Sequence, residues 1–120
     1  MNLNEIAAEL VAGCREDRAK ENLEKLYAED AVSVEAQDFM DMGRETHGRD
    51  AIRGKHEWWE GAHEVSGASV SDPMPHGEDR FAVIFEVQGK VKETGEAFDM
   101  KEVGVYHVAD GKIVREEFFY

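Results

Sequence analysis

The chain has 120 residues, of which 42% are hydrophobic, and this is enough for one domain spanning residues 1–120 but too little for two. The formal net charge of -13 at pH 7 excludes nucleic acids and anionic membrane surfaces as partners, because both repel such a surface. No stretch approaches the roughly 20 apolar residues of a membrane span, and the N-terminal segment carries Glu5 and Glu9 in place of a basic leader, so we expect a cytoplasmic protein.

The first part of the chain has the spacing of amphipathic helices. Residues 3–14 place apolar side chains on one face, and Asn2 with Glu5 three residues later is typical of a capping box. A second short helix is predicted from about residue 18 to residue 27, before the β-branched run 32–34, which predicts a strand.

The single cysteine, Cys14, ends the apolar series of the first predicted helix. This position is typical of a buried, unreactive thiol, and one cysteine forms no disulfide framework.

A third helix is predicted from about residue 50 to residue 63, after a polar, Met-rich stretch over residues 38–47 that indicates a loop or a distorted hairpin. An apolar helix face that carries imidazoles either hydrogen-bonds them within a core or directs them into a cavity. The face in question carries Ile52, His56, Trp59 and His63. His63 lies too far along the helix to share a metal with His56, so we expect it to cap the helix C-terminus or to lie at the mouth of a pocket.

The second half of the chain is typical of strands joined by turns. The predicted strands cover residues 65–70, 81–88, about 98–108 and 112–119. Pro73 and Pro75 mark the first turn, glycines flank the second, and the dipeptide Asp110-Gly111 predicts a tight hairpin. Helices followed by antiparallel strands indicate an α+β fold, in which helices lie on one face of a curved sheet.

No metal or cofactor is predicted. The histidines do not have the usual spacing of metal ligands, and two of them lie in predicted loops. They are His47, His56, His63, His76 and His107.

Three phrases carry a resemblance to a known family: residues 26–32 (LYAEDAV), 48–53 (GRDAIR) and 110–114 (DGKIV). With the order of the elements, they make the chain similar to the nuclear transport factor 2-like superfamily and to its SnoaL-like branch. The resemblance implies a cystatin-like cone, in which a curved mixed or antiparallel sheet wraps around the N-terminal and central helices and leaves a pocket at its open end. The superfamily includes polyketide cyclases, ketosteroid isomerases and noncatalytic binding or dimer modules, so the resemblance is more specific for fold than for activity.

An ungapped comparison with ketosteroid isomerases places Glu35 at the position of their proton-abstracting aspartate. It also places His56 at a pocket tyrosine, and it puts Leu10 or Val11 and Gly104 where those enzymes have the two donors of their oxyanion hole. Both donors are thus absent at those positions, and steroid isomerisation is not expected. A pocket carboxylate acts as a general base when desolvation raises its pKa. A solvated residue at the strand edge is the alternative for Glu35, and a structural histidine is the alternative for His56.

The strands supply the remaining candidates. Alternation directs Phe81 and Phe85 to the core. The resemblance directs Glu102, Tyr106 and Val108 into the cone, together with Val114, Glu116, Phe118 and Tyr120. Glu102 and Glu116 then either share a proton, because like charges raise each other's pKa, or are salt-bridged or exposed.

The opposite sheet face would present a partly apolar patch, which predicts homodimerisation through the outer face of the sheet. The patch is formed by Ala82, Ile84, Val103 and Val105 among Lys101, Arg115 and Glu117.

Three functions remain open. The first is general acid-base catalysis on a small, mostly apolar carbonyl compound, with Glu35 as base and His56 with Tyr27 or Tyr106 as donors to the oxyanion. In that case the walls of the pocket would be Trp59, Phe81, Phe85 and Met100, with Glu102, Glu116 and Phe118 also lining it. The second is a noncatalytic dimer that binds a small apolar molecule. The third is a structural dimer with a filled cone, which a pocket below the roughly 300 Å³ of typical ligand sites would favour.

Overall fold

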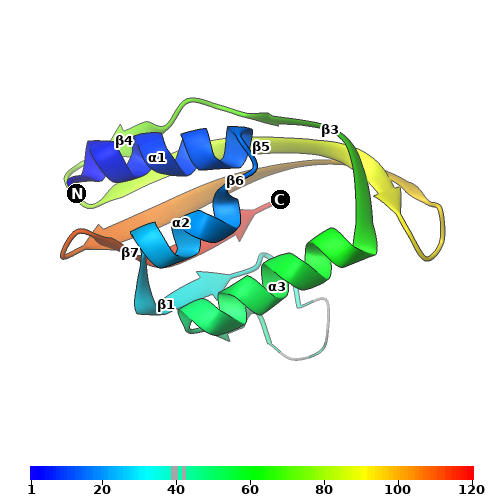
Figure 1. Ribbon diagram of the computed structural model, residues 1–120, viewed down its shortest axis with the longest axis horizontal. Coiled ribbons are helices and arrows are strands. Elements are labelled where there is room, and N and C mark those ends of the chain that lie inside the picture. The colour runs from blue at the N-terminus through cyan, green and yellow to red at the C-terminus, as the bar shows by residue number, and fades with distance from the viewer. Residues whose placement is uncertain (39–40, 42) are drawn as a thin grey trace.

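The computed structural model describes residues 1–38, 41 and 43–120, and over these residues the chain forms three helices and seven strands. Figure 1 shows the helices together on one side of a long, curved sheet. The helices are α1 (Leu3–Arg15), α2 (Ala19–Leu26) and α3 (Arg49–Ala62). This arrangement confirms the predicted α+β class.

The strands form one open mixed sheet in the order β2-β1-β7-β6-β5-β3, with β4 paired to β5. In the described part of the chain β1 and β7 are parallel and the other neighbouring strands are antiparallel. Their bounds are β1 (Tyr27–Val34), β2 (Glu45–His47), β3 (His63–Val70), β4 (Met74–His76), β5 (Arg80–Val91), β6 (Ala97–Ala109) and β7 (Lys112–Phe119).

Local sequence signals account for the ends of several elements. Asn2 and Glu5 form the predicted capping box at the start of α1. Asp110 and Gly111 join β6 to β7. Both have positive φ angles, 52° and 76°, as the two central residues of a type I′ hairpin turn require. Gly89 lies where β5 approaches β3, because a Cβ atom there would be 2.1 Å from the backbone oxygen of Glu64.

Several strands differ from the prediction in extent. β1 begins at Tyr27, directly after α2, so the predicted strand at residues 32–34 is only its end. The stretch 74–76, predicted as a turn, forms the short strand β4 on the edge of β5. Proline is compatible with such an edge position because no hydrogen bond from its nitrogen is needed. Within the predicted loop 38–47, residues 45–47 form β2, whereas residues 39, 40 and 42 lie outside the described residues.

The core lies between the helices and the concave face of the sheet. α1 packs against β3, β4 and β5, and α3 packs against β1, β2 and β3. The large buried side chains of the core are Ile6, Leu10, Leu23, Leu26, Ile52, Phe81, Tyr106 and Ile113.

A bulge in β7 corrects one prediction of orientation. Val108 pairs with Ile113 but His107 pairs with Arg115, so Val114 is an extra residue in the ladder. The buried residue that precedes Glu116 in β7 is therefore Ile113 and not Val114, which is half-buried. Simple alternation fails here because it assumes an unbroken two-residue period.

Candidate functional site

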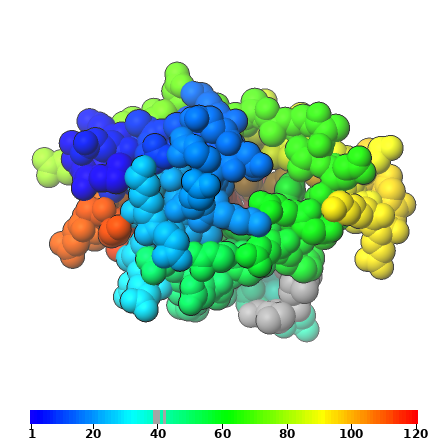
Figure 2. Space-filling model, viewed as in Figure 1, coloured from blue at the N-terminus to red at the C-terminus, as the bar shows by residue number. Residues whose placement is uncertain are grey.

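A cavity of about 160 Å³ lies between the three helices and the concave face of the sheet. Figure 2 shows the surface hollowed between the α1–α2 pair and α3. Five lining residues are buried and form what we call the floor: Leu10, Asn22, Tyr27, Tyr106 and Glu116. Six are partly exposed and form what we call the rim: Cys14, Ala19, His56, Phe85, Glu102 and Phe118.

Glu116 is the most deeply placed titratable group of the floor. It is 1% exposed, and burial raises the pKa of its carboxyl to about 7, while the positive charge of Lys55 and a hydrogen bond from Tyr27 act in the opposite direction. Its Oε1 atom has no hydrogen-bond partner among the described residues. Glu116 is therefore largely a neutral acid below pH 7.

Glu102 lies on the rim, opposite Phe85 in the β5–β6 ladder. Burial raises the pKa of this carboxyl to about 7, the negative charge of Glu35 adds to the rise, and Lys55 opposes it. A carboxyl that is half ionised at neutral pH takes up and releases protons readily.

Glu102 and Glu116 line the same cavity from neighbouring strands. Glu116 pairs with Tyr106, four residues along β6 from Glu102, so roughly 13 Å of strand separates their backbone positions. The negative charge of Glu102 still contributes to the raised pKa of Glu116. Among the described residues neither carboxyl forms an ion pair, and neither residue is fully exposed, so a shared proton stays a prediction.

Tyr27 and Tyr106 are the two phenols of the floor. Tyr106 stacks on Phe81 with ring centroids 4.9 Å apart and meets Phe118 edge-on at 6.4 Å. Burial and then the charge of Glu116 hold the pKa of both phenols well above the usual value. Both hydroxyls therefore remain protonated donors at neutral pH.

His56 is a rim residue on α3. Burial and the neighbouring charge of Lys55 lower its pKa, so the imidazole is mainly neutral at pH 7. Tyr27 donates to Glu116, and Glu35 accepts from Lys55 and Tyr120, so both residues have partners other than His56. A relay from His56 through Tyr27 or Glu35 stays a prediction.

Glu35 is not among the lining residues of the cavity. Its Oε1 atom is 2.8 Å from Lys55 Nζ, and the Tyr120 hydroxyl donates to its Oε2 atom at 3.0 Å. Lys55 also donates to Ser33 Oγ at 2.5 Å and lies 5.5 Å from the centre of the Phe118 ring. The carboxylate predicted as the base is thus held in an ion pair beside the rim.

Three other predicted wall residues lie outside the lining. Trp59 stacks on His63 at 4.4 Å at the end of α3, Phe81 lies behind Tyr106, and Met100 is half-buried opposite Val87. His63 Nδ1 is 2.8 Å from the backbone oxygen of Trp59. This confirms its predicted position at the helix C-terminus.

Sequence reasoning missed Lys55, Leu10 and Asn22 as contributors to the site. Lys55 is an ordinary charged residue of an amphipathic helix in the sequence, and only the approach of β1 to α3 brings it to Glu35. Cys14 also lines the cavity, and burial raises the pKa of its thiol to about 11, which agrees with the predicted unreactive thiol.

Two further features bear on binding. Within residues 1–38, 41 and 43–120, no group of three or more His, Cys, Asp or Glu side chains is arranged to hold a metal ion. Over the same part of the chain, no helix combines the length and the apolar character needed to cross a membrane.

Comparison with known proteins gives one family match. The model of the SnoaL-like domain family matches residues 1–120. A crystal structure from Mesorhizobium loti, described as a candidate SnoaL-like polyketide cyclase and, in brackets, as a carbohydrate phosphatase, is 39% identical with a TM-score of 0.92, and the match covers 100% of both chains. No curated protein sequence matches the chain.

More distant structures share the fold and include complexes with small molecules. A Mycobacterium tuberculosis protein in complex with estradiol-17β-hemisuccinate is 18% identical with a TM-score of 0.76, over 100% of this chain and 95% of that one. A Catenulispora acidiphila protein with a ketosteroid isomerase-like fold, in complex with trimethylamine, is 18% identical with a TM-score of 0.67, over 98% and 85% of the two chains.

Proposed function

Since the chain belongs to the SnoaL-like domain family, as its sequence resemblance predicted, we propose that its cavity binds a small, mostly apolar carbonyl compound and transfers a proton on it by general acid-base catalysis. The observation that carries the proposal is the presence of two carboxyls, Glu102 and Glu116, with a pKa of about 7 in the lining of one cavity. Pairs of groups poised near the working pH are typical of acid-base sites.

The different burial of the two carboxyls assigns their roles. Glu116 is fully buried, so a negative charge costs more there than on the partly exposed Glu102. Glu102 is therefore the base that removes a proton from the carbon next to the carbonyl, and Glu116 is the acid that protonates the carbonyl oxygen. The product is an enol, and no charge remains on the ligand.

In this proposal other residues supply the hydrogen-bond donors to the carbonyl oxygen, in place of the two oxyanion-hole donors that the sequence comparison found absent. In that comparison the neutral acid of ketosteroid isomerases falls on Gly104, and here the neutral acid is Glu116 on the neighbouring strand. Tyr106 is a buried phenol that remains protonated and supplies a further donor, whereas the Tyr27 hydroxyl donates to Glu116 itself.

The size of the cavity limits the ligand to about one ring. An apolar cavity of roughly 150 Å³ holds benzene, whereas sites for drug-sized ligands begin at roughly 300 Å³. The present cavity of about 160 Å³ therefore suits a compound such as cyclohexanone and is too small to enclose a steroid. The steroid ligand of the Mycobacterium tuberculosis protein is for this reason not transferred to this chain.

The small volume also favours a second function, a structural dimer without a ligand. Against it stands the lining, because a cone that serves only as a core gains nothing from two desolvated carboxyls and unpaired polar atoms. Native mass spectrometry of freshly purified protein distinguishes the two, since a retained small molecule contradicts the structural function.

Exchange of the α-hydrogens of cyclohexanone with D₂O, followed by NMR, tests the proposed function. The rate in excess of buffer catalysis is expected to follow a bell-shaped pH profile with its maximum near pH 7, where Glu102 is partly ionised and Glu116 partly protonated. No excess exchange between pH 5 and pH 9, together with no binding of cyclohexanone, would contradict the proposal.

A homodimer through the outer face of the sheet is the partner we propose. Ala82 pairs with Val105 and Ile84 pairs with Val103 in the β5–β6 ladder. Val103 also pairs with Phe119 of β7, and Phe119 is 53% exposed. The Val103→Asp variant is expected to sediment as a monomer where the native protein sediments as a dimer, because a carboxylate at the centre of the patch would be desolvated. An unchanged sedimentation coefficient in the variant, or a monomeric native protein, excludes this interface.

A further inference from the structure

The floor of the cavity carries two buried polar atoms that no described residue satisfies. They are Asn22 Oδ1 and Glu116 Oε1, and their residues are 2% and 1% exposed. A buried polar atom without a partner costs free energy, so unpaired atoms on a cavity wall indicate what a ligand supplies.

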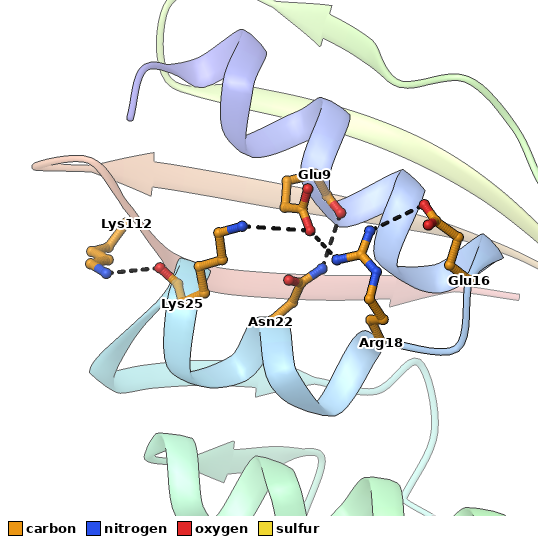
Figure 3. Close-up of polar contacts among 6 residues, drawn as sticks. All are labelled: Glu9, Glu16, Arg18, Asn22, Lys25 and Lys112. Atoms are coloured by element: carbon orange, nitrogen blue, oxygen red, sulfur yellow. Dashed lines mark hydrogen bonds and ion pairs between the residues drawn. The ribbon is translucent and has the colours of Figure 1, made fainter.

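The orientation of Asn22 is set by the contact between α1 and α2. Its Nδ2 atom donates to the backbone oxygen of Glu9 at 3.0 Å, as Figure 3 shows. Gly13 leaves room for this amide, because a Cβ atom there would be 2.0 Å from Asn22 Nδ2. Since the donor end of the amide is occupied, its acceptor end, Oδ1, is the part available to the cavity that Asn22 lines.

The contact that holds this amide is reinforced by charge. Arg18 and Lys25 on either side of Asn22 both form ion pairs with the Glu9 side chain, and these contacts surround the amide in Figure 3. A rotation of the amide would break its hydrogen bond to α1 and place Oδ1 against the backbone oxygen of Glu9, where neither atom can donate.

We propose that Asn22 Oδ1 and the Glu116 carboxyl form a subsite for a neutral hydroxyl group, so that the ligands of this cavity are small ring alcohols or enols. This inference rests on the proposed function and names the chemical class that its site recognises. Asn22 Oδ1 is an acceptor only and needs a donor, while a protonated carboxyl donates its own proton. A hydroxyl is a small neutral group that can both donate to the first and accept from the second.

A carbonyl group satisfies only half of this subsite. The oxygen of a ketone accepts from Glu116 and leaves Asn22 Oδ1 unpaired. When Glu116 protonates that oxygen in the proposed step, Glu116 becomes a carboxylate and the new hydroxyl of the enol donates to Asn22 Oδ1. Asn22 Oδ1 therefore gains a partner as the enol forms, which is the direction that catalysis of enolisation requires.

Three ligands built on one benzene ring test the subsite at pH 6, where Glu116 is mainly neutral. Phenol presents a hydroxyl, toluene presents a methyl group of similar size, and benzylamine presents an ammonium group. Calorimetric titration is expected to give phenol a dissociation constant at least tenfold below those of toluene and benzylamine, since a polar site rejects an analogue that leaves its groups unpaired.

Variants of the two residues show whether they produce the preference for phenol over toluene. Asn22→Leu and, as a second test, Glu116→Leu are expected to remove the tenfold preference for phenol over toluene, whereas Glu116→Gln, whose amide still donates, keeps it. Asn4→Leu, at an exposed position of α1, is the matched control and keeps it as well. Circular dichroism identifies any variant that does not fold.

The outcomes separate this inference from the function on which it rests. Toluene or benzylamine binding as tightly as phenol overturns the hydroxyl subsite but leaves a ligand-binding cavity. A preference that persists in both leucine variants also overturns the subsite. If none of the three compounds binds, the cavity is not a ligand site, and the proposed function and this inference both fail.

Discussion

The Glu102→Gln variant is expected to exchange the α-hydrogens of cyclohexanone about a hundredfold or more slowly than the native protein, the lower part of the range for loss of a general base. Glutamine keeps the volume of the side chain and removes the carboxylate. The Glu35→Gln variant is expected to lose much less, because Glu35 lies outside the lining and is bound to Lys55 and Tyr120. NMR exchange rates of the three proteins at pH 7 make the comparison.

The same experiment decides between the two carboxylates. A larger loss in Glu35→Gln than in Glu102→Gln would identify Glu35 as the base, as the comparison with ketosteroid isomerases implies, and would contradict the role given to Glu102. Glu93→Gln, an exposed substitution in the turn between β5 and β6, is the control and is expected to leave the rate unchanged.

Stability is expected to depend on pH through Glu116. Its pKa in the folded protein, about 7, lies above the usual value for glutamate, about 4.3. The folded state therefore binds more protons than the unfolded state between these pH values. The stabilising contribution is complete below about pH 4 and is lost as the pH rises to about 7, after which it stays constant. For this fully buried group the loss amounts to about 4 kcal/mol.

The Glu116→Gln variant has no such titration and is expected to be more stable than the native protein at pH 8 by about 4 kcal/mol, which corresponds to about 15 °C in Tm. At pH 4 the two proteins are expected to be similar, because Glu116 is then neutral. Urea unfolding at both pH values gives the difference. An equal or lower stability of Glu116→Gln at pH 8 would show that the carboxyl is not destabilised by burial.

The fold was predictable from sequence because its signals are local. The capping box at Asn2 and the dipeptide Asp110-Gly111 set the ends of elements through contacts within a few residues. The start of β1 at Tyr27 was missed, because residues 28–30 are mostly polar and lie in an irregularity of the β1–β7 ladder, between the pairs formed by Tyr27 and Val32.

The candidate site was predictable where alternation along a strand decides orientation. Glu102, Tyr106 and Glu116 were placed in the cavity by the two-residue period and the resemblance. Asn22 and Lys55 were missed, because their roles come from packing between elements distant in sequence. The pairing of Glu116 with Tyr106 depends on the β6–β7 register, which a bulge shifts.

The most direct test of the account is the titration of the glutamate side-chain carboxyl carbons by ¹³C NMR in the native protein, with Glu102→Gln and Glu116→Gln used to assign the two resonances. We expect two carboxyls with titration midpoints near pH 7, one lost in each variant. Midpoints near the usual value of about 4.3 for both groups would contradict the account, because neither carboxyl would then hold a proton at neutral pH.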